Sequence, residues 1–219
     1  AASWSGGKDS CLALWRSQSQ GLHITHLLTA LDETGLKTRS HGVTKGLISA
    51  QGDAMGMNNE FISASWRDYE VRFIEKLKAL RLLGVEQMIF GDIDLLAHRE
   101  WEEMVCTQAQ LSATLPLWDE NRLALVHEFL DAGFKAKVVC VDGRHLDQSF
   151  VGLEFDHQFI QSLPKGVDAC GENGEFHTFV YDGPNFSHPV PYKSLGKHSY
   201  TSPKEYGAIT FHFDLLDVI

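Results

Sequence analysis

The sequence predicts an α/β protein in which a parallel, doubly wound sheet is followed by a smaller α+β domain. In the first half of the 219-residue chain, short apolar runs alternate with longer segments of helical periodicity, which is the pattern of repeated βαβ units. After residues 115–118 the composition changes, and from Pro164 onward glycine, proline, histidine and aromatic residues are frequent. We therefore predict two domains, residues 1–118 and residues 119–219.

The first domain should contain four strands connected by helices. A short strand at residues 2–4 leads into a helix whose first turns begin near Cys11. The other strands are expected at residues 24–31, 61–63 and 85–90, and the other helices at residues 44–57, 65–83 and 94–110. The helix at residues 65–83 has an apolar stripe that we expect to be core, formed by Trp66, Tyr69, Phe73, Leu77 and Leu80.

The second domain should be smaller and mixed. A helix is expected at residues 121–132, where Gly133 ends it, and a short helix at residues 156–163. The predicted strands are residues 134–141, 176–181 and 208–213. Since no low-complexity linker separates the two domains, we expect them to pack together with a cleft between them.

Composition narrows the class of protein. The formal charge of −10 argues against a broad nucleic-acid surface, which is ordinarily basic. No apolar run approaches the roughly 20 residues that span a bilayer, and no signal peptide is visible, so we expect a cytoplasmic protein without a membrane partner. The four cysteines are widely spaced, which is typical of reduced, mostly buried thiols.

The segment Ser5–Ser10, SGGKDS, predicts a phosphate site. It lies between a short strand and a helix, and its two glycines let the backbone approach an anion closely. The helix N-terminus adds roughly half a positive charge at the same place. Lys8 supplies a full charge, and Ser5 and Ser10 supply hydroxyl donors. The spacing differs from that of the common P-loop, GxxxxGK[ST].

Two further polar turns fall at the carboxyl ends of predicted strands, where ligands bind in sheets of this kind. Asp32 follows the strand at residues 24–31, and Gly91 with Asp92 follows the strand at residues 85–90. Asp92 is a candidate for a metal or water contact, or it caps the helix that follows. Arg99 and Glu102 lie on that helix, where they face either the substrate or solvent.

A second motif lies at Gly171–Glu175, GENGE, just before the strand at residues 176–181. Two carboxylates three residues apart, Glu172 and Glu175, can bind a cationic group, hold Mg²⁺ or position ammonia. One of them can also have a raised pKa and act as a base. The plainer alternative is a glycine-rich hairpin with solvated glutamates.

SGGKDS resembles the PP-loop of the ATP pyrophosphatases, which cleave ATP between its α and β phosphates. With the second motif the chain resembles the diphthine–ammonia ligase family over nearly its whole length. The resemblance includes GDI at residues 91–93, the stretch around Val105-Cys106, PLW at residues 116–118 and GENGE. It implies a PP-loop (HUP-like) ATP-binding domain and a C-terminal domain that completes the substrate site.

The resemblance also implies an activity. ATP adenylates a carboxylate acceptor, pyrophosphate leaves, and ammonia or an amine displaces AMP to form an amide. The expected cofactors are ATP and Mg²⁺, with Lys8, Asp9 and Asp92 catalytic and Asp92 the candidate metal ligand. ATP would contact Ser5, Gly6, Gly7, Lys8, Asp9, Ser10, Ala30, Leu31, Asp32 and Gly91. The acceptor would contact Glu172, Asn173, Glu175, His177, Thr178, Arg99 and Glu102.

The sequence departs from the family pattern at one position. Family members are similar to GEGGEYET at the second motif, whereas this chain has GENGEFHT, which places His177 where they have a third acid. An imidazole instead of a fixed negative charge should change what the pocket accepts. We therefore expect the acceptor to be a small molecule or a protein side chain, and we expect no nucleic-acid partner. We also expect that the chain can form a homodimer.

Two alternatives to the ligase are a PP-loop enzyme that modifies tRNA and a non-catalytic adenine-nucleotide-binding protein. The charge and the lack of a cysteine pair disfavour the first alternative. The combination of Lys8, Asp9, Asp92 and both glutamates disfavours the second, because binding alone does not need a paired-acid loop.

Overall fold

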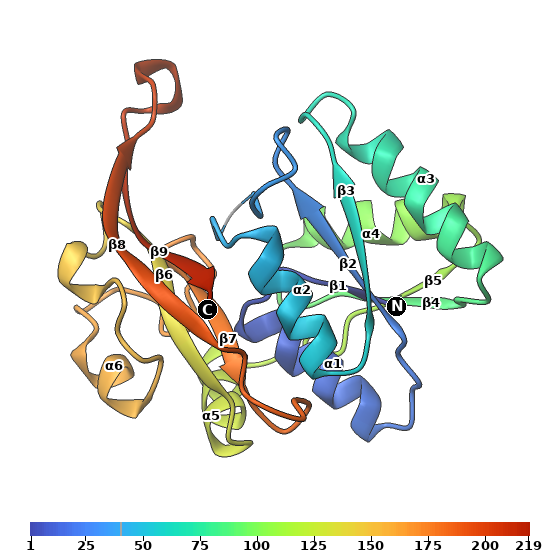
Figure 1. Cartoon of the computed structure of the whole chain (residues 1–219), viewed down its shortest axis with the longest axis horizontal. Coiled ribbons are helices and arrows are strands. Elements are labelled where there is room, and N and C mark those ends of the chain that lie inside the picture. The colour runs from blue at the N-terminus through green and yellow to red at the C-terminus, as the bar shows by residue number, and fades with distance from the viewer. Residues whose placement is uncertain (40) are drawn as a thin grey trace.

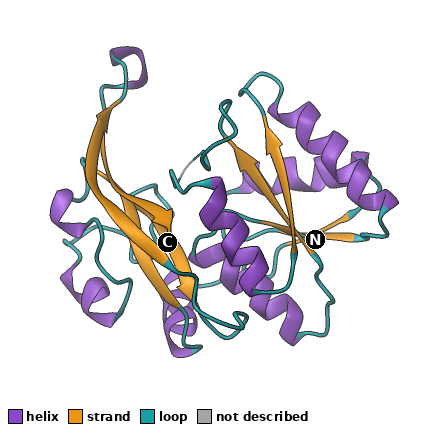
Figure 2. Cartoon of the chain, viewed as in Figure 1, coloured by secondary structure: helices purple, strands orange, loops and turns teal. Residues whose placement is uncertain are grey.

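The computed structural model describes residues 1–39 and 41–219. Two separate sheets organise the chain, one with helices on both sides and one antiparallel (Figures 1 and 2). The predicted α/β class with a smaller α+β domain is confirmed. A boundary at residue 118 stays a prediction, although the first sheet ends at Thr114 and the second begins at Lys135.

The first sheet is parallel and has the strand order β3-β2-β1-β4-β5. Its strands are β1 (Ala2–Ser3), β2 (His26–Leu31), β3 (Asn58–Ser63), β4 (Gln87–Ile89) and β5 (Ser112–Thr114). The helices that connect them are α1 (Lys8–Ser19), α2 (Lys45–Ala54), α3 (Tyr69–Leu82) and α4 (Leu96–Gln108). Strand β5 was not predicted, because three residues at a sheet edge are too short to show a pattern.

Neighbouring residues of a strand belong to different hydrophobic cores. In β2, Leu27 packs into the core that includes α1 and α2, whereas Leu28 packs into the core of α3 and α4. Successive side chains of a strand point to opposite faces, so a strand covered on both faces must be apolar throughout. This explains why residues 24–31 form a nearly continuous apolar run, and it makes the sheet doubly wound.

The second sheet is antiparallel with the order β7-β6-β9-β8. Its strands are β6 (Lys135–Asp142), β7 (Phe176–Asp182), β8 (Tyr192–Thr201) and β9 (Thr210–Val218). Helices α5 (Arg122–Asp131) and α6 (His157–Ser162) lie beside it, with short 3-10 turns at Gln148–Phe150 and Lys204–Tyr206. Strand β8 was not predicted, because its mostly polar and exposed residues lack an apolar alternation. The β8–β9 hairpin extends away from the body of the molecule (Figure 1).

One continuous core joins the two sheets. Phe155 and Phe179 of the second half belong to the same cluster as Leu12 and Leu47 of α1 and α2. Strand β7 therefore lies against the side of the first sheet that carries α1 and α2 (Figure 1). None of the described helices is both long and apolar enough to cross a membrane.

The expected core stripe of the third helix is wrong at one residue. The helix begins at Tyr69, so Trp66 lies in the segment before it and is 78% exposed. Phe73, Leu77 and Leu80 are buried as expected. The side chains of Ser65 and Asp68 form a hydrogen bond. This bond lies in the turn before the helix and not in the helix's first turn.

Candidate functional site

The segment Ser5–Ser10 forms the predicted strand–turn–helix junction. Strand β1 ends at Ser3, and Gly7 is the N-cap of α1. Gly6 has φ of +79°, a conformation that favours glycine. Gly91 follows β4 and packs against α1, since a Cβ there would lie 2.9 Å from the backbone nitrogen of Ser10. Gly91 thus lets the end of β4 approach the first turn of α1 closely.

The turn is bound tightly to the second half of the chain. The backbone N–H of Lys8 donates to Thr178 Oγ1 at 3.0 Å, and that of Val180 donates to the carbonyl of Gly6 at 2.9 Å. The buried amide of Gln51 donates to the carbonyls of both Gly6 and Val180. Residues from α2 and β7 therefore fix the turn's shape.

A charged cluster lies at the N-terminus of α1. Lys8 Nζ contacts both carboxylate oxygens of Asp9 at 2.7 Å and lies 3.8 Å from Glu172 Oε1. Burial alone would lower the pKa of Lys8, but the neighbouring acids raise it above its usual value. Burial, with Asp9 adding to it, raises the pKa of Glu172 to about 7. The cluster thus holds a fixed cation beside a carboxyl that titrates near neutrality.

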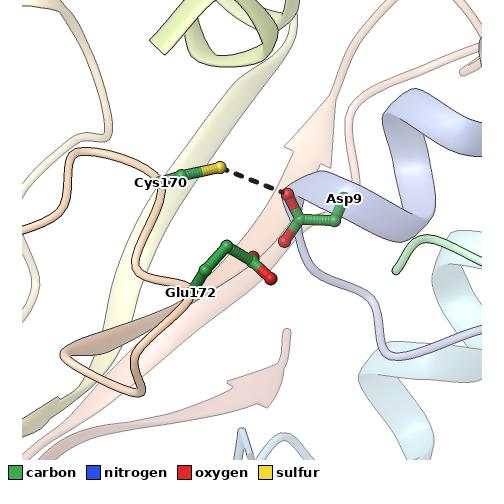
Figure 3. A group of neighbouring side chains, drawn as sticks. All are labelled: Asp9, Cys170 and Glu172. Atoms are coloured by element: carbon green, nitrogen blue, oxygen red, sulfur yellow. Dashed lines mark hydrogen bonds between the residues drawn. The ribbon is translucent and has the colours of Figure 1, made fainter. Parts of the chain in front are cut away.

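Asp9, Cys170 and Glu172 approach one another from opposite ends of the chain (Figure 3). One ligand atom from each lies within 4.8 Å of the others, which would suit a metal ion. The Cys170 thiol lies 3.9 Å from Asp9 Oδ1, and burial raises its pKa to about 12, so it is a neutral thiol at pH 7. The two carboxylates are therefore the candidate ligands, and oxygen donors suit Mg²⁺.

The two glutamates of the GENGE motif point to different surroundings. Glu172 lines the cavity, whereas Glu175 is 1% exposed and does not. The Glu175 carboxylate accepts hydrogen bonds from the backbone N–H groups of Asp168 and Asn173 and from Asn173 Nδ2. Glu175 and Asn173 therefore bond to each other inside the loop that presents Glu172.

Asp92 and Glu102 form a second acidic pair. Burial, with neighbouring Asp92 adding to it, raises the pKa of Glu102 to about 10, so Glu102 is protonated at neutral pH. Asp92 Oδ1 also lies 2.7 Å from His98 Nδ1. Among the described residues, the group of side chains that is placed to bind a metal ion consists of Asp9, Cys170 and Glu172. Asp92 as a metal ligand stays a prediction.

An aromatic wall occupies the α3–α4 side of the site. Its rings, which line the cavity next to Ala30, belong to Trp66, Tyr69, Phe73, Phe90 and Trp101. The Arg39 guanidinium lies 4.6 Å from the centre of the Trp66 ring. Its Nε and Nη2 are buried without a partner among the described residues, as is Glu102 Oε2. This wall therefore offers flat surfaces together with free polar atoms.

These groups surround one cavity of about 620 Å³. The predicted residues that line it are Ser5, Lys8, Asp9, Ser10, Ala30, Gly91, Asp92, Glu102, Glu172, His177 and Thr178. The predicted residues that do not line it are Gly6, Gly7, Leu31, Asp32, Arg99, Asn173 and Glu175. Gly6 and Gly7 shape the turn, and Leu31 is core. Asp32 accepts a hydrogen bond from Thr34 within its own turn, and Arg99 pairs with Glu103 on the outside of α4.

Sequence reasoning assigned the wall residues Trp66, Tyr69 and Phe73 to the core, although they line the cavity. The polar residues that it missed at or beside the cavity include Arg39, His41, Gln51 and Cys170. Arg39 and His41 belong to a segment without a recognisable motif, and only the fold brings them to the site. Gln51 carried a signal, since a glutamine among the apolar positions of a predicted helix needs a buried hydrogen-bond partner. Cys170 directly precedes the GENGE motif but resembles any other buried cysteine.

The fold is that of a doubly wound α/β protein, and the cavity lies beside the carboxyl ends of its strands, where proteins of this class bind their ligands. Residues 1–113 match the family model of the diphthamide synthase N-terminal domain, and residues 121–204 match that of the diphthamide synthase C-terminal domain. The chain therefore belongs to the diphthamide synthase family. Membership identifies it as an ATP-dependent ligase that forms amides.

Curated relatives agree with this assignment. The chain is similar to a Bos taurus protein named diphthine–ammonia ligase, with 31% identity over 87% of this chain and 81% of the relative. A Danio rerio protein of the same name is 25% identical over 85% of this chain and 83% of the relative. Among solved structures, a predicted tRNA methyltransferase subunit from Methanocaldococcus jannaschii matches 82% of this chain and 94% of its own, with 14% identity and a TM-score of 0.39.

Proposed function

We propose that this cavity binds ATP and a carboxylate acceptor, adenylates the acceptor and amidates it with ammonia, and that the acceptor is diphthine or a close chemical analogue. Relatives that carry the name diphthine–ammonia ligase support this acceptor. Family membership favours the ligase over the tRNA-modifying enzyme and the non-catalytic nucleotide binder.

One observation carries the proposal. Lys8 and Asp9 come from one end of the chain and Glu172 from the other, yet their charged groups meet at the wall of one cavity. A phosphate-binding cation beside two carboxylates that can hold a metal ion suits adenylyl transfer, because the protein must hold a polyphosphate and balance its developing negative charge. Binding by shape alone would not bring like-charged carboxylates together.

The walls of the cavity suggest how ATP lies. Lys8 and Ser10 at the start of α1 would bind the phosphates, where the helix N-terminus favours an anion. The adenine would lie beside Ala30 and against the aromatic wall, with Phe73 and Trp101 as apolar contacts. Glu102 Oε2 and the Nε and Nη2 atoms of Arg39 have no hydrogen-bond partner among the described residues, so they would be available to the edge of the base.

The reaction would proceed in two balanced steps. A carboxylate oxygen of the acceptor attacks the α-phosphorus, and the bond to the bridging oxygen of the β-phosphate breaks to release pyrophosphate. Ammonia then attacks the acyl carbon, loses a proton and displaces AMP, which leaves an amide. In the first step, Lys8 would hold the pyrophosphate that departs, and the tight turn around Gly6 would keep the reacting groups aligned.

The carboxylates of Asp9 and Glu172 fit a magnesium ion, since they are oxygen ligands on the side of the cavity where the phosphates would lie. When bound, Mg²⁺ would neutralise phosphate charge and favour departure of pyrophosphate. Glu172 would face both the phosphates and the acceptor. Glu175 and Asn173 would act indirectly, by holding the loop that presents Glu172.

The test is a reaction with ATP, MgCl₂, ammonium chloride and a diphthine-bearing peptide. We expect AMP and pyrophosphate in equal amounts, together with a peptide whose mass changes as an acid becomes an amide. Omitting ammonium should stop amide formation, and Glu172→Gln should lose product while it retains the fold. ADP and phosphate as products would overturn cleavage at the α-phosphate. Amidation of other carboxylates but not of diphthine would overturn the acceptor.

A further inference from the structure

Two histidines from distant parts of the chain pack against each other beside the Ser5–Ser10 turn. His41 belongs to the segment between β2 and α2, and His177 belongs to β7. Their ring centres are 4.6 Å apart with an interplanar angle of 52°, and both rings line the cavity. The sequence offers no local motif for His41.

The pair lies directly against the turn. A Cβ on Gly7 would lie only 2.8 Å from His41 Nε2, so the imidazole covers this glycine. Thr178, the neighbour of His177, accepts the hydrogen bond from the Lys8 backbone N–H at 3.0 Å. Both histidines are therefore held where the polyphosphate of ATP would lie.

Both rings are neutral and have spare hydrogen-bonding capacity. Burial, with Lys8 adding to it, lowers the pKa of His177 to about 4. Burial, with His177 and Lys8 adding to it, lowers the pKa of His41 well below its usual value. Within residues 1–39 and 41–219, neither ring makes a hydrogen bond. A neutral imidazole keeps one N–H donor and one acceptor nitrogen.

The turn itself has fewer free donors than its sequence suggests. The backbone N–H of Gly7 donates to Ser5 Oγ at 3.2 Å, and that of Lys8 donates to Thr178. Lys8 Nζ is shared with the Asp9 carboxylate. A polyphosphate bound here would therefore gain donors from side chains across the cavity, where the two imidazoles are suitably placed.

We propose that His41 and His177 form a pair of neutral hydrogen-bond donors that binds the pyrophosphate portion of ATP. The pair would add donors without adding charge beside Lys8. It would also place His177 in phosphate binding rather than in acceptor binding. The inference rests on the proposed function, because it assumes that the phosphates of ATP lie at this turn.

The test is calorimetric titration of the full chain with pyrophosphate, ATP and AMP in the presence of MgCl₂. His41→Ala and His177→Ala should each bind pyrophosphate and ATP about 10- to 100-fold more weakly, which is the effect of losing a hydrogen bond to a charged group. AMP affinity should change by less than about twofold. His41→Gln keeps an N–H donor and should recover most of the lost affinity.

A matched control is available in the chain. The rings of His127 and His157 also lie against each other, with centres 5.8 Å apart, but neither ring lines the cavity. His127→Ala should therefore bind all three ligands normally. Unchanged pyrophosphate affinity in both His→Ala variants would overturn the proposal. Equal losses for AMP and pyrophosphate would also overturn it, because they would show a general structural role. If wild type binds pyrophosphate through this pair yet forms no amide, the proposed function fails and the pair stands.

Discussion

The two loops that meet at the cavity contribute different charged groups and are held in different ways. The Ser5–Ser10 turn supplies the cation Lys8 with the Asp9 carboxylate beside it, and its backbone is fixed by partners from α2 and β7. The loop that carries GENGE supplies acid, and it is fixed largely by its own buried carboxylate, Glu175. Both segments are rich in glycine. They differ in whether the groups that hold the loop in shape belong to the loop itself or to other elements.

The same division separates the two glutamates of one motif. Glu172 is a cavity residue with a raised pKa, and Glu175 is a buried acceptor of three N–H groups. Variants of Glu172 and Glu175 can therefore separate an effect on the reaction from an effect on the shape of the loop. Variants of Lys8, in the Ser5–Ser10 turn, test the role of the cation.

Replacing the cation should have the largest effect. We expect Lys8→Ala to lower the rate of pyrophosphate formation by about 10²- to 10³-fold, which is typical when a group that stabilises transition-state charge is removed. Pyrophosphate release is the measurement. Lys135→Ala removes an exposed ion pair with Asp182 and serves as the control. Near-normal turnover in Lys8→Ala would place the phosphates elsewhere.

The second largest effect should be on stability. Glu175→Gln replaces one acceptor oxygen by a donor among three N–H groups, so the free energy of unfolding should fall by about 2–4 kcal/mol. Urea denaturation measures this, with Glu172→Gln as the matched control. Glu172→Gln should not destabilise the fold at pH 8, since it removes a half-buried charge whose raised pKa shows that the folded state disfavours it. Equal stability losses in both variants would contradict the division of roles.

The strand–turn–helix arrangement of Ser5–Ser10 was predictable from the sequence. Gly6, Lys8 and Ser10 lie within one strand–turn–helix unit, so their arrangement follows from neighbouring residues. The doubly wound sheet was also predictable, because strands covered on both faces are apolar throughout. The predicted apolar stripe of the third helix wrongly included Trp66, because periodicity alone does not show at which residue a helix begins.

The sequence could not predict the parts that depend on long-range packing. His41 and His177 are far apart in the chain, and only the docking of β7 against the turn brings their rings together. Nor could spacing distinguish Glu172 from Glu175, because both flank glycines in one motif. Burial inside the folded loop determines which of the two faces the cavity.

The charge on Glu172 should make activity depend on pH. With its pKa raised to about 7, the carboxylate is lost below neutrality, so turnover at limiting Mg²⁺ should fall by about tenfold per pH unit below pH 7. Stability should respond in the opposite direction. The folded state binds the extra proton, so this group's contribution to stability falls as pH rises from 4.5 to about 7. Both trends should be absent in Glu172→Gln, and a wild-type profile that is flat across pH 7 would contradict the assignment.

The smallest effect tests how far the cavity extends along α4. Arg99 lies on the outside of this helix, 2.7 Å from Glu103 and 5.0 Å from the centre of the Trp118 ring, whereas Glu102 faces the cavity. Arg99→Ala should therefore change turnover by less than about twofold, because exposed ion pairs contribute little. Glu102→Ala should weaken ATP binding, because it removes a wall beside the base. Amide formation is the measurement. A tenfold loss of amide in Arg99→Ala would mean that the acceptor reaches past Asp92 onto the outer face of α4. The acidic part of the cavity would then extend beyond the residues around Glu172.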